Sequence, residues 1–170
     1  MTLIVEDGTG KTTSESYCSV AQADAYHSVR STASTWVDFD TDAKEAALRL
    51  ATDYIQQLYA GRWVGRRCTD GQALDWPRYD ADRPDSSSGY WLSTVVPDIL
   101  VKGCAELALK AASAPLVVDL GRETVNERVD VISVTYAQGA ERQTTYAAAD
   151  LWIQPLLTGG SGDVINITRA

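Results

Sequence analysis

Histidine, cysteine and lysine are scarce in this sequence, and each shortage weighs against a class of function. The 170 residues contain one His, three Cys and only four Lys among 15 basic residues. A catalytic triad or Cys–His pair would have to use His27, which lies beside Tyr26 in a predicted helix, and no Gly-x-Ser-x-Gly motif is present. One histidine and no Cys-x-x-Cys pair also supply metal ligands poorly. We therefore expect neither an enzyme nor a metal or cofactor site.

Long apolar runs are also missing. The sequence begins MTLIVEDGTG, without a basic start and with an apolar run too short for a signal peptide. No later run approaches the length that spans a membrane. Cys18, Cys68 and Cys104 are far apart, and Cys104 fits the apolar face of a helix. These features predict a protein of a reducing compartment without membrane contact.

The charge balance is acidic, whereas the aromatic composition favours contacts. The formal net charge is −8 and the pI is about 4.5, which disfavours a broad nucleic-acid footprint but leaves room for a local basic groove. Eleven of the 15 basic residues are Arg, which suits fixed carboxylates and aromatic rings better than Lys does. Five Trp and eight Tyr stand against one Phe, and both types suit interfaces as well as cores.

Apolar spacing and capping signals predict three main helices. Ser19 and Gln22 form a capping box that begins a helix running to about residue 30. Asp40 or Thr41 caps a second helix that ends near residue 60, and apolar residues recur along one of its faces. Pro97 begins a third helix that reaches about residue 113. The stretch 31–40 between the first two is predicted to be a loop.

The rest of the chain predicts smaller elements. Residues 125–129 and 131–136 are typical of two strands, and residues 146–157 of a short helix. The sequence thus predicts a mainly α fold: a small bundle of three main helices plus a short C-terminal helix, with a β-hairpin at about 124–137 and extended terminal arms. We expect one domain over residues 1–158, with a helical core at about 19–114, followed by a flexible C-terminal arm at 159–170.

Residues 62–96 form a long loop without sustained periodicity, and its Pro, Gly, Asp and Ser content predicts exposure. Its basic and aromatic members are the candidate interface: Arg62, Trp63, Arg66, Arg67, Trp76 and Arg78. Such residues anchor protein partners, or stack on bases and contact phosphates of single-stranded DNA. An equally good interpretation is an internal network in which Arg67 or Arg78 pairs with Asp70 or Asp75 and the Trp rings cover the core.

The C-terminal tail adds a second candidate contact. The linker GGSG precedes three β-branched residues, Val164, Ile165 and Ile167. A short strand after a flexible linker could add to a neighbouring subunit's sheet, and a frayed terminus explains the pattern equally well.

Two further patterns favour structural explanations. Gly8–Thr12, with the sequence GTGKT, lacks the first Gly of a phosphate loop because Val5 holds that position, and no helix follows directly. It is therefore predicted to be a polar loop. The Asp residues between 70 and 85 lack the spacing of a calcium loop and are typical of turns.

Three blocks of sequence resemble a family of small tailed-phage proteins. They are IVEDGTG with ESYCSVAQADAYH, AALRLATDYI with GRWVGRR and QALDWPR, and VVPDILVKGCAELAL. The resemblance covers most of residues 3–113, weakens through the strands and is lost in the tail. The family is often labelled DnaT-like single-stranded-DNA-binding, and its helix order is similar to that of head–tail connector, or head-completion, proteins.

The resemblance implies a virion protein of the head–tail neck, made in the host cytoplasm. Connectors of this kind form a ring, generally dodecameric, between the portal protein and the next neck or tail protein, and genome DNA passes through the lumen without specific binding. The family brings no catalytic residues and no cofactor. Our leading interpretation is such a connector, and the alternative is a replication-type module that binds single-stranded DNA.

Overall fold

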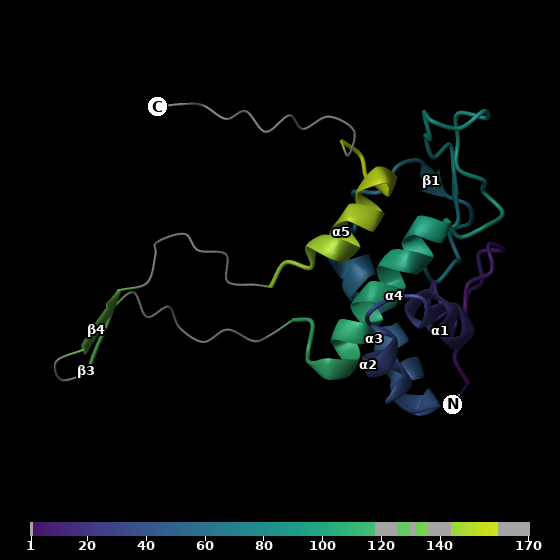
Figure 1. Ribbon diagram of the computed structural model, residues 1–170. Helices are drawn as coiled ribbons and strands as arrows, with labels where there is room; N and C mark the ends of the chain where they lie inside the picture. Colours follow the sequence, from purple (N-terminus) through teal and green to yellow (C-terminus); the bar gives the residue numbers. More distant parts are fainter. Residues whose placement is uncertain (1, 118–125, 130–131, 136–143, 160–170) are drawn as a thin grey trace, which may run out of the picture.

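The computed structural model describes residues 2–117, 126–129, 132–135 and 144–159 (Figure 1). Within them the elements are α1 (Val20–Ser28), α2 (Ala33–Val37), α3 (Thr41–Leu58), β1 (Arg66–Arg67), β2 (Arg78–Tyr79), α4 (Asp98–Ser113), β3 (Asn126–Val129), β4 (Ile132–Thr135), α5 (Ala147–Ile153) and the 3-10 helix η1 (Gln154–Leu156). The predicted mainly α fold with a small hairpin is confirmed. None of these helices is long and apolar enough to cross a membrane.

Helix α4 lies at the centre of the helical body and contacts α1, α3 and α5 (Figure 1). Its buried face includes Leu100, Cys104 and Leu107, each at most 1% exposed, as the apolar spacing predicts. A Cβ at Gly103 would lie 2.9 Å from Ile153 Cγ1, so a side chain there would push α5 away. Small residues on α4 therefore let α5 approach closely.

Helix α3 supplies the second half of the core. Asp40 caps it by accepting a 2.8 Å hydrogen bond from the Ala43 amide. Leu48, Ala51 and Ile55 are fully buried on one face, which is the face that the sequence spacing predicts. The helix ends at Leu58, slightly before the expected boundary, with Tyr59 as its C-cap.

The region around α1 confirms one prediction and corrects another. Ser19 and Gln22 form the expected capping box. Residues 33–37, predicted to be part of a loop, form helix α2 instead. The reason is tertiary: Trp36 is 2% exposed, its Nε1 donates to Asp24 over 2.7 Å, and its ring lies 4.9 Å from that of His27.

The predicted loop 62–96 is mostly irregular chain; many of its residues are exposed as expected, but the stretch from Gln72 to Arg78 is largely buried. Strands β1 and β2 pair antiparallel, with Arg66 opposite Tyr79. Gly65 has a φ of 66°, and a Cβ there would lie 2.2 Å from the Tyr79 carbonyl oxygen. Only glycine permits so close an approach of the two backbones.

The C-terminal half contains the two remaining predicted elements. Strands β3 and β4 form a separate antiparallel hairpin in which Asn126 pairs with Thr135 and Val129 with Ile132. Helix α5 continues into η1, where Pro155 lies in the first turn, as expected of a proline that cannot continue an α-helix. The predicted C-terminal arm covers residues 159–170, of which 160–170 lie outside the described residues.

Candidate interaction surface

The two tryptophans of the candidate interface are part of the core. Trp63 is 5% exposed and Trp76 is fully buried, and their rings meet edge to face at 6.2 Å. Trp63 Nε1 donates to Asp75 Oδ2 over 3.0 Å. Neither ring can stack on a base or insert into a partner while the fold is intact, so the internal network describes both better than the interface does.

Two of the candidate arginines are bound to backbone carbonyls. Arg78 is 9% exposed and donates to the carbonyl oxygens of Val64, Gly65 and Asp75 at 2.7, 2.8 and 3.1 Å. Burial lowers the pKa of its guanidinium, and the neighbouring Asp75 opposes that change. The guanidinium ties the chain near β1 to the chain near β2.

Arg67 fastens the same segment from the other side. Its Nη2 donates to the carbonyl oxygens of Gln72 and Leu74 at 2.6 and 3.1 Å, and its Nε lies 3.8 Å from Asp75. Gln72 is itself 3% exposed and donates to the Leu74 and Pro77 carbonyls. We call residues 62–81 the Arg–Trp knot, because these arginine and tryptophan side chains hold it closed.

Arg62 and Arg66 are exposed arginines of the knot, as is Arg67, whose side chain is 38% exposed beside its carbonyl bonds. Arg66 pairs with Asp80 at 2.9 Å, and both side chains are more than two-thirds exposed. Its guanidinium lies 5.9 Å from the ring of Tyr79, which is 47% exposed. Arg62 lies 5.5 Å from the Tyr59 ring. These two arginines are free to meet a partner, since exposed ion pairs contribute little to stability.

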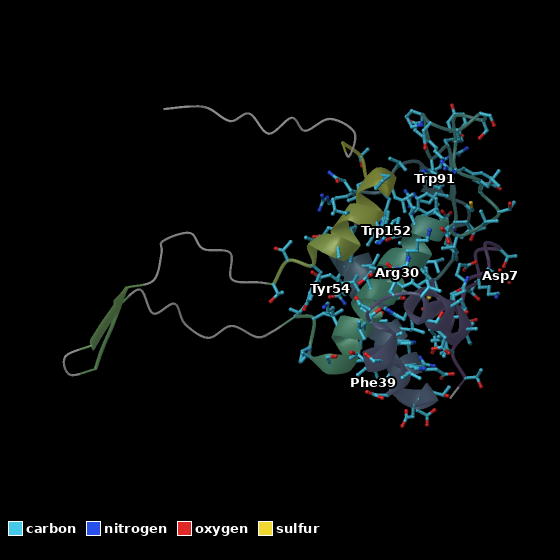
Figure 2. All side chains as sticks on the ribbon, in the orientation of Figure 1. Asp7, Arg30, Phe39, Tyr54, Trp91 and Trp152 are labelled. Atoms are coloured by element: carbon cyan, nitrogen blue, oxygen red, sulfur yellow. The ribbon has the colours of Figure 1, made fainter. Side chains whose placement is uncertain are left out.

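A second exposed group lies in residues 82–96, which we call the outer loop. Arg83 stacks 4.2 Å from the centre of the Trp91 ring, and Tyr90 and Leu92 are 52% and 63% exposed. Figure 2 shows Trp91 at the end of the body opposite Phe39. Sequence reasoning treated DADRPDSSSGYW only as exposed chain and missed these residues. The signal was present, because an Arg and two aromatics within nine residues are typical contact residues.

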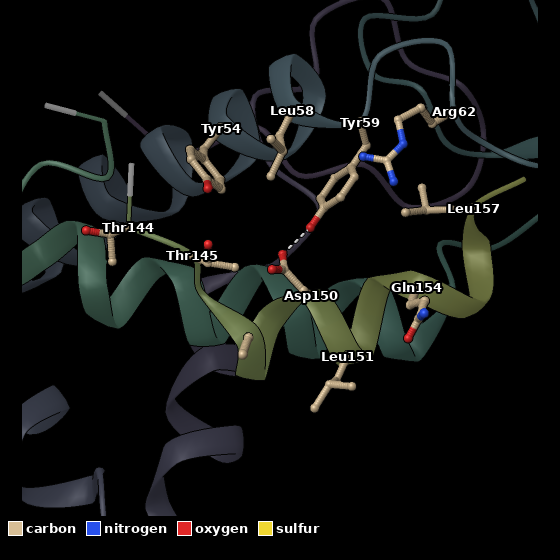
Figure 3. Close-up of a pocket in the computed structure, with 11 residues that line it drawn as sticks. Tyr54, Leu58, Tyr59, Arg62, Thr144, Thr145, Asp150, Leu151, Gln154 and Leu157 are labelled. Carbon is tan, nitrogen blue, oxygen red and sulfur yellow. Dashed lines mark hydrogen bonds between the residues drawn. The ribbon is translucent and has the colours of Figure 1, made fainter. Parts of the chain in front are cut away.

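A groove opens between the C-terminal half of α3 and α5 (Figure 3). Its volume is about 620 Å³. Tyr54 and Leu58 point from α3 towards it, and Leu157 closes one end (Figure 3). Leu58 is 43% exposed. Neighbouring exposed apolar side chains of this kind mark binding surfaces more often than isolated ones do.

One polar pair crosses the groove. The Tyr59 hydroxyl donates to Asp150 Oδ1, joining the C-cap of α3 to α5 (Figure 3). Burial raises the pKa of the Tyr59 hydroxyl, and the Asp150 carboxylate raises it further. Tyr59 therefore stays protonated and acts as a fixed hydrogen-bond donor. Such a pair holds the two walls together and offers no acid–base chemistry near neutral pH.

The GTGKT loop, predicted to be polar, encloses an anion that the chain itself provides. Glu6 is 3% exposed, and its carboxylate accepts 2.9 Å hydrogen bonds from the amides of Gly8, Gly10 and Lys11 and a 2.7 Å bond from Ser14. Successive backbone amides form anion-binding concavities. Here the concavity is filled, so the loop is structural rather than a phosphate site.

His27 is also structural. It is fully buried, with Nδ1 2.8 Å from Thr32 Oγ1 and Nε2 3.1 Å from the Ala105 carbonyl oxygen. Burial lowers the pKa of its imidazole. Among the described residues no three His, Cys, Asp or Glu side chains gather as metal ligands would. The C-terminal candidates Val164, Ile165 and Ile167 lie outside the described residues.

The geometry thus defines a small acidic helical protein with exposed arginines, exposed aromatic rings and an apolar groove. Residues 1–170 match the family described as "Putative DnaT-like ssDNA binding protein", and the chain belongs to this family. No curated protein and no solved structure matches the chain.

Proposed function

We propose that this protein is a structural subunit of a tailed-phage particle, a head–tail connector that assembles with copies of itself into a ring beneath the portal and joins the capsid to the tail. The observation that carries the proposal is the apolar groove between α3 and α5, which exposes Leu58 in a chain of net charge −8. An apolar groove on an acidic surface suits a protein partner better than a polyanion.

The placement of the family's most specific blocks supports the same function. GRWVGRR and ALDWPR build the Arg–Trp knot, in which Trp76 and Arg78 act as internal braces. The knot holds Arg62 and Arg66 at fixed positions on the surface. A rigid scaffold that presents a few charged side chains suits a repeated subunit contact, in which each arginine meets an acidic group of the next copy.

Copy number in the particle tests the proposal most directly. We expect quantitative mass spectrometry of purified virions to give about one copy of this protein per portal subunit, as a closed ring of the same order as the portal ring would. A protein that is abundant in infected cells but absent from the virion would contradict the proposal and favour a replication role.

Charge reversal then tests the contact. Arg62→Glu and Arg66→Glu should each lower the number of copies incorporated into particles, because an exposed ion pair across an interface becomes a repulsion. The matched control is Lys110→Glu, the same charge change at an exposed residue of α4. Arg67 is unsuitable, because its bonds to the Gln72 and Leu74 carbonyls would be lost and the fold disturbed. Equal incorporation of all three variants would contradict an interface at the knot.

Single-stranded DNA binding is the second candidate function, and the family description favours it. The exposed Arg66–Tyr79 pair and the partly buried Arg83–Trp91 pair supply rings and guanidinium groups of the type that hold unpaired bases and phosphates. Binding of a labelled oligo-dT should then fall steeply with salt and be weakened by Tyr79→Ala. Leu50→Ala removes another exposed apolar side chain without a charge change and serves as the control. No binding at low salt would eliminate this candidate.

A further inference from the structure

The groove between α3 and α5 lies where the described chain ends. Leu157 lines the groove. The next residue, Thr158, donates from its amide and from Oγ1 to the Arg62 carbonyl oxygen, at 2.7 and 2.6 Å. Arg62 lines the groove as well. The last residues before Gly160 are therefore fixed at the edge of the groove, and eleven residues of sequence, 160–170, start from that edge.

The sequence of those eleven residues fits the groove in composition. Gly160, Ser161 and Gly162 form a linker, and Val164, Ile165 and Ile167 follow within a span of four residues. The groove offers the exposed Leu58 and the partly exposed Tyr54 as its apolar surface, next to the buried Tyr59 and Leu157. Short aliphatic side chains and an apolar groove are complementary, since docking removes both apolar surfaces from water.

We propose that the groove binds residues 164–167 of a second copy of this chain. The proposal rests on the self-assembly in the proposed function and names the segment that makes the contact. From Gly159 to Val164 the chain can span at most about 17 Å, so the receiving groove must lie within that reach of Gly159 of the giving copy. Each copy then gives one segment and receives one, which is the head-to-tail contact that closes a ring.

A photo-crosslinking experiment on the full-length protein tests the contact directly. A benzophenone amino acid replaces Ile165, and copies that carry it, labelled with ¹⁵N, are mixed with unlabelled wild-type copies. After irradiation, mass spectrometry identifies the partner peptide and its isotope. We expect crosslinks from the labelled segment to unlabelled peptides that contain residues 54–62 or 144–157. Crosslinks only within one copy, crosslinks elsewhere, or none would overturn the proposal.

A pair of variants adds a matched control. Leu58→Lys in the unlabelled copy places a charge in the groove at the last residue of α3, where a cation is compatible with the helix dipole. It should lower the crosslink yield about tenfold, as loss of one buried Leu contact implies. Val37→Lys makes the same change at the last residue of α2, also exposed but not on the groove. Its yield should equal that of wild type, and equal loss in both variants would overturn the proposal.

The outcome is separable from that of the proposed function. A crosslink between copies of a protein that is absent from virions would leave the segment–groove contact in place and remove the connector role. A protein present at one copy per portal subunit but without the crosslink would keep the connector role and overturn the groove assignment.

Discussion

The Arg–Trp knot and the outer loop are adjacent, similar in composition and opposite in behaviour. Both contain tryptophan and arginine within an irregular segment, yet Trp76 and Arg78 in the knot are buried whereas Tyr90 and Leu92 in the outer loop are more than half exposed. In the knot, backbone carbonyls surround the Arg78 guanidinium. In the outer loop, Arg83 has the exposed Asp85 at 3.3 Å and the face of Trp91. Arginine thus stabilises the fold where several backbone carbonyl oxygens accept hydrogen bonds from its guanidinium. Where no such carbonyl groups surround it, the side chain can contact a partner.

The largest expected effect is the loss of the buried ring at the centre of the knot. Trp76→Ala should lower the free energy of unfolding by about 3–5 kcal/mol, because it leaves a cavity that the neighbouring Trp63 cannot fill. Chemical denaturation followed by circular dichroism measures the change. Tyr90→Ala in the outer loop is the comparison and should cost under about 1 kcal/mol. An equal loss of unfolding free energy in the two variants would contradict the distinction between the Arg–Trp knot and the outer loop.

The next effect is the loss of the hydrogen bonds from Arg78 to backbone carbonyl oxygens. Arg78→Ala should cost about 3 kcal/mol, because it removes three hydrogen bonds and leaves buried carbonyl oxygens without a donor. Arg83→Ala should cost under about 1 kcal/mol, since its ion pair is exposed. The same denaturation experiment serves both variants. A cost for Arg83→Ala as large as that for Arg78→Ala would show that the outer loop is braced in the same way.

A smaller effect extends the comparison to a carboxylate. Glu6, like Arg78, is enclosed by backbone groups, but here the groups are amides that donate to it. Glu6→Gln keeps the shape and removes the charge, and it should cost about 1–2 kcal/mol, because charge-assisted bonds become neutral ones. Thermal unfolding measures the change. Asp38→Asn, at an exposed position just after α2, controls for loss of one negative charge, and an equal shift in both variants would contradict an enclosed Glu6.

The smallest effect is a pH dependence of stability. It arises in α1, outside both the Arg–Trp knot and the outer loop. Burial lowers the pKa of His27 below its ordinary value of 6.5, so the unfolded chain binds a proton more readily than the native protein does. Neutral His27 therefore makes its full contribution to the free energy of unfolding above about pH 6.5, the ordinary pKa of histidine. That contribution is lost as the pH falls below this value. We expect stability to decline between about pH 7 and about pH 5, above the range where carboxylates titrate.

His27→Gln supplies the control for that decline. The variant lacks the titrating imidazole, so its free energy of unfolding should change less over the same range of pH, measured by denaturation at each pH. An unchanged slope would show that the decline comes from other groups. The two halves of the 62–96 segment should contribute little there, because no histidine lies within them.

Helices with strong local signals were predictable. The capping box at Ser19, the cap at Asp40 and the proline at position 97 each satisfy or avoid a free backbone amide at a helix start, and the structure begins helices at these places. Helix α2 was not predictable in the same way. Its N-cap residue, Thr32, makes no side-chain cap bond, and the helix forms because Trp36 is held by Asp24 and packs on His27.

The candidate site was predictable in residue type but not in position. Arg62, Arg66 and Arg67 are exposed as the interface hypothesis required, whereas Trp63, Trp76 and Arg78 are internal. Burial of these three depends on contacts with residues far along the chain, such as the hydrogen bond from the Asp75 amide to the hydroxyl of Tyr17. The groove was also out of reach, because its walls come from segments about ninety residues apart.

The sequence by itself determined the helical core of this protein, its acidic balance and its family, because local caps, apolar spacing and charge are properties of neighbouring residues. Only the tertiary structure decided which arginine and aromatic side chains are buried and stabilise the fold, and which face outward. The physical reason is that a guanidinium or an indole is stable in either setting. What selects between them is whether carbonyl groups and apolar side chains from distant segments converge on that position.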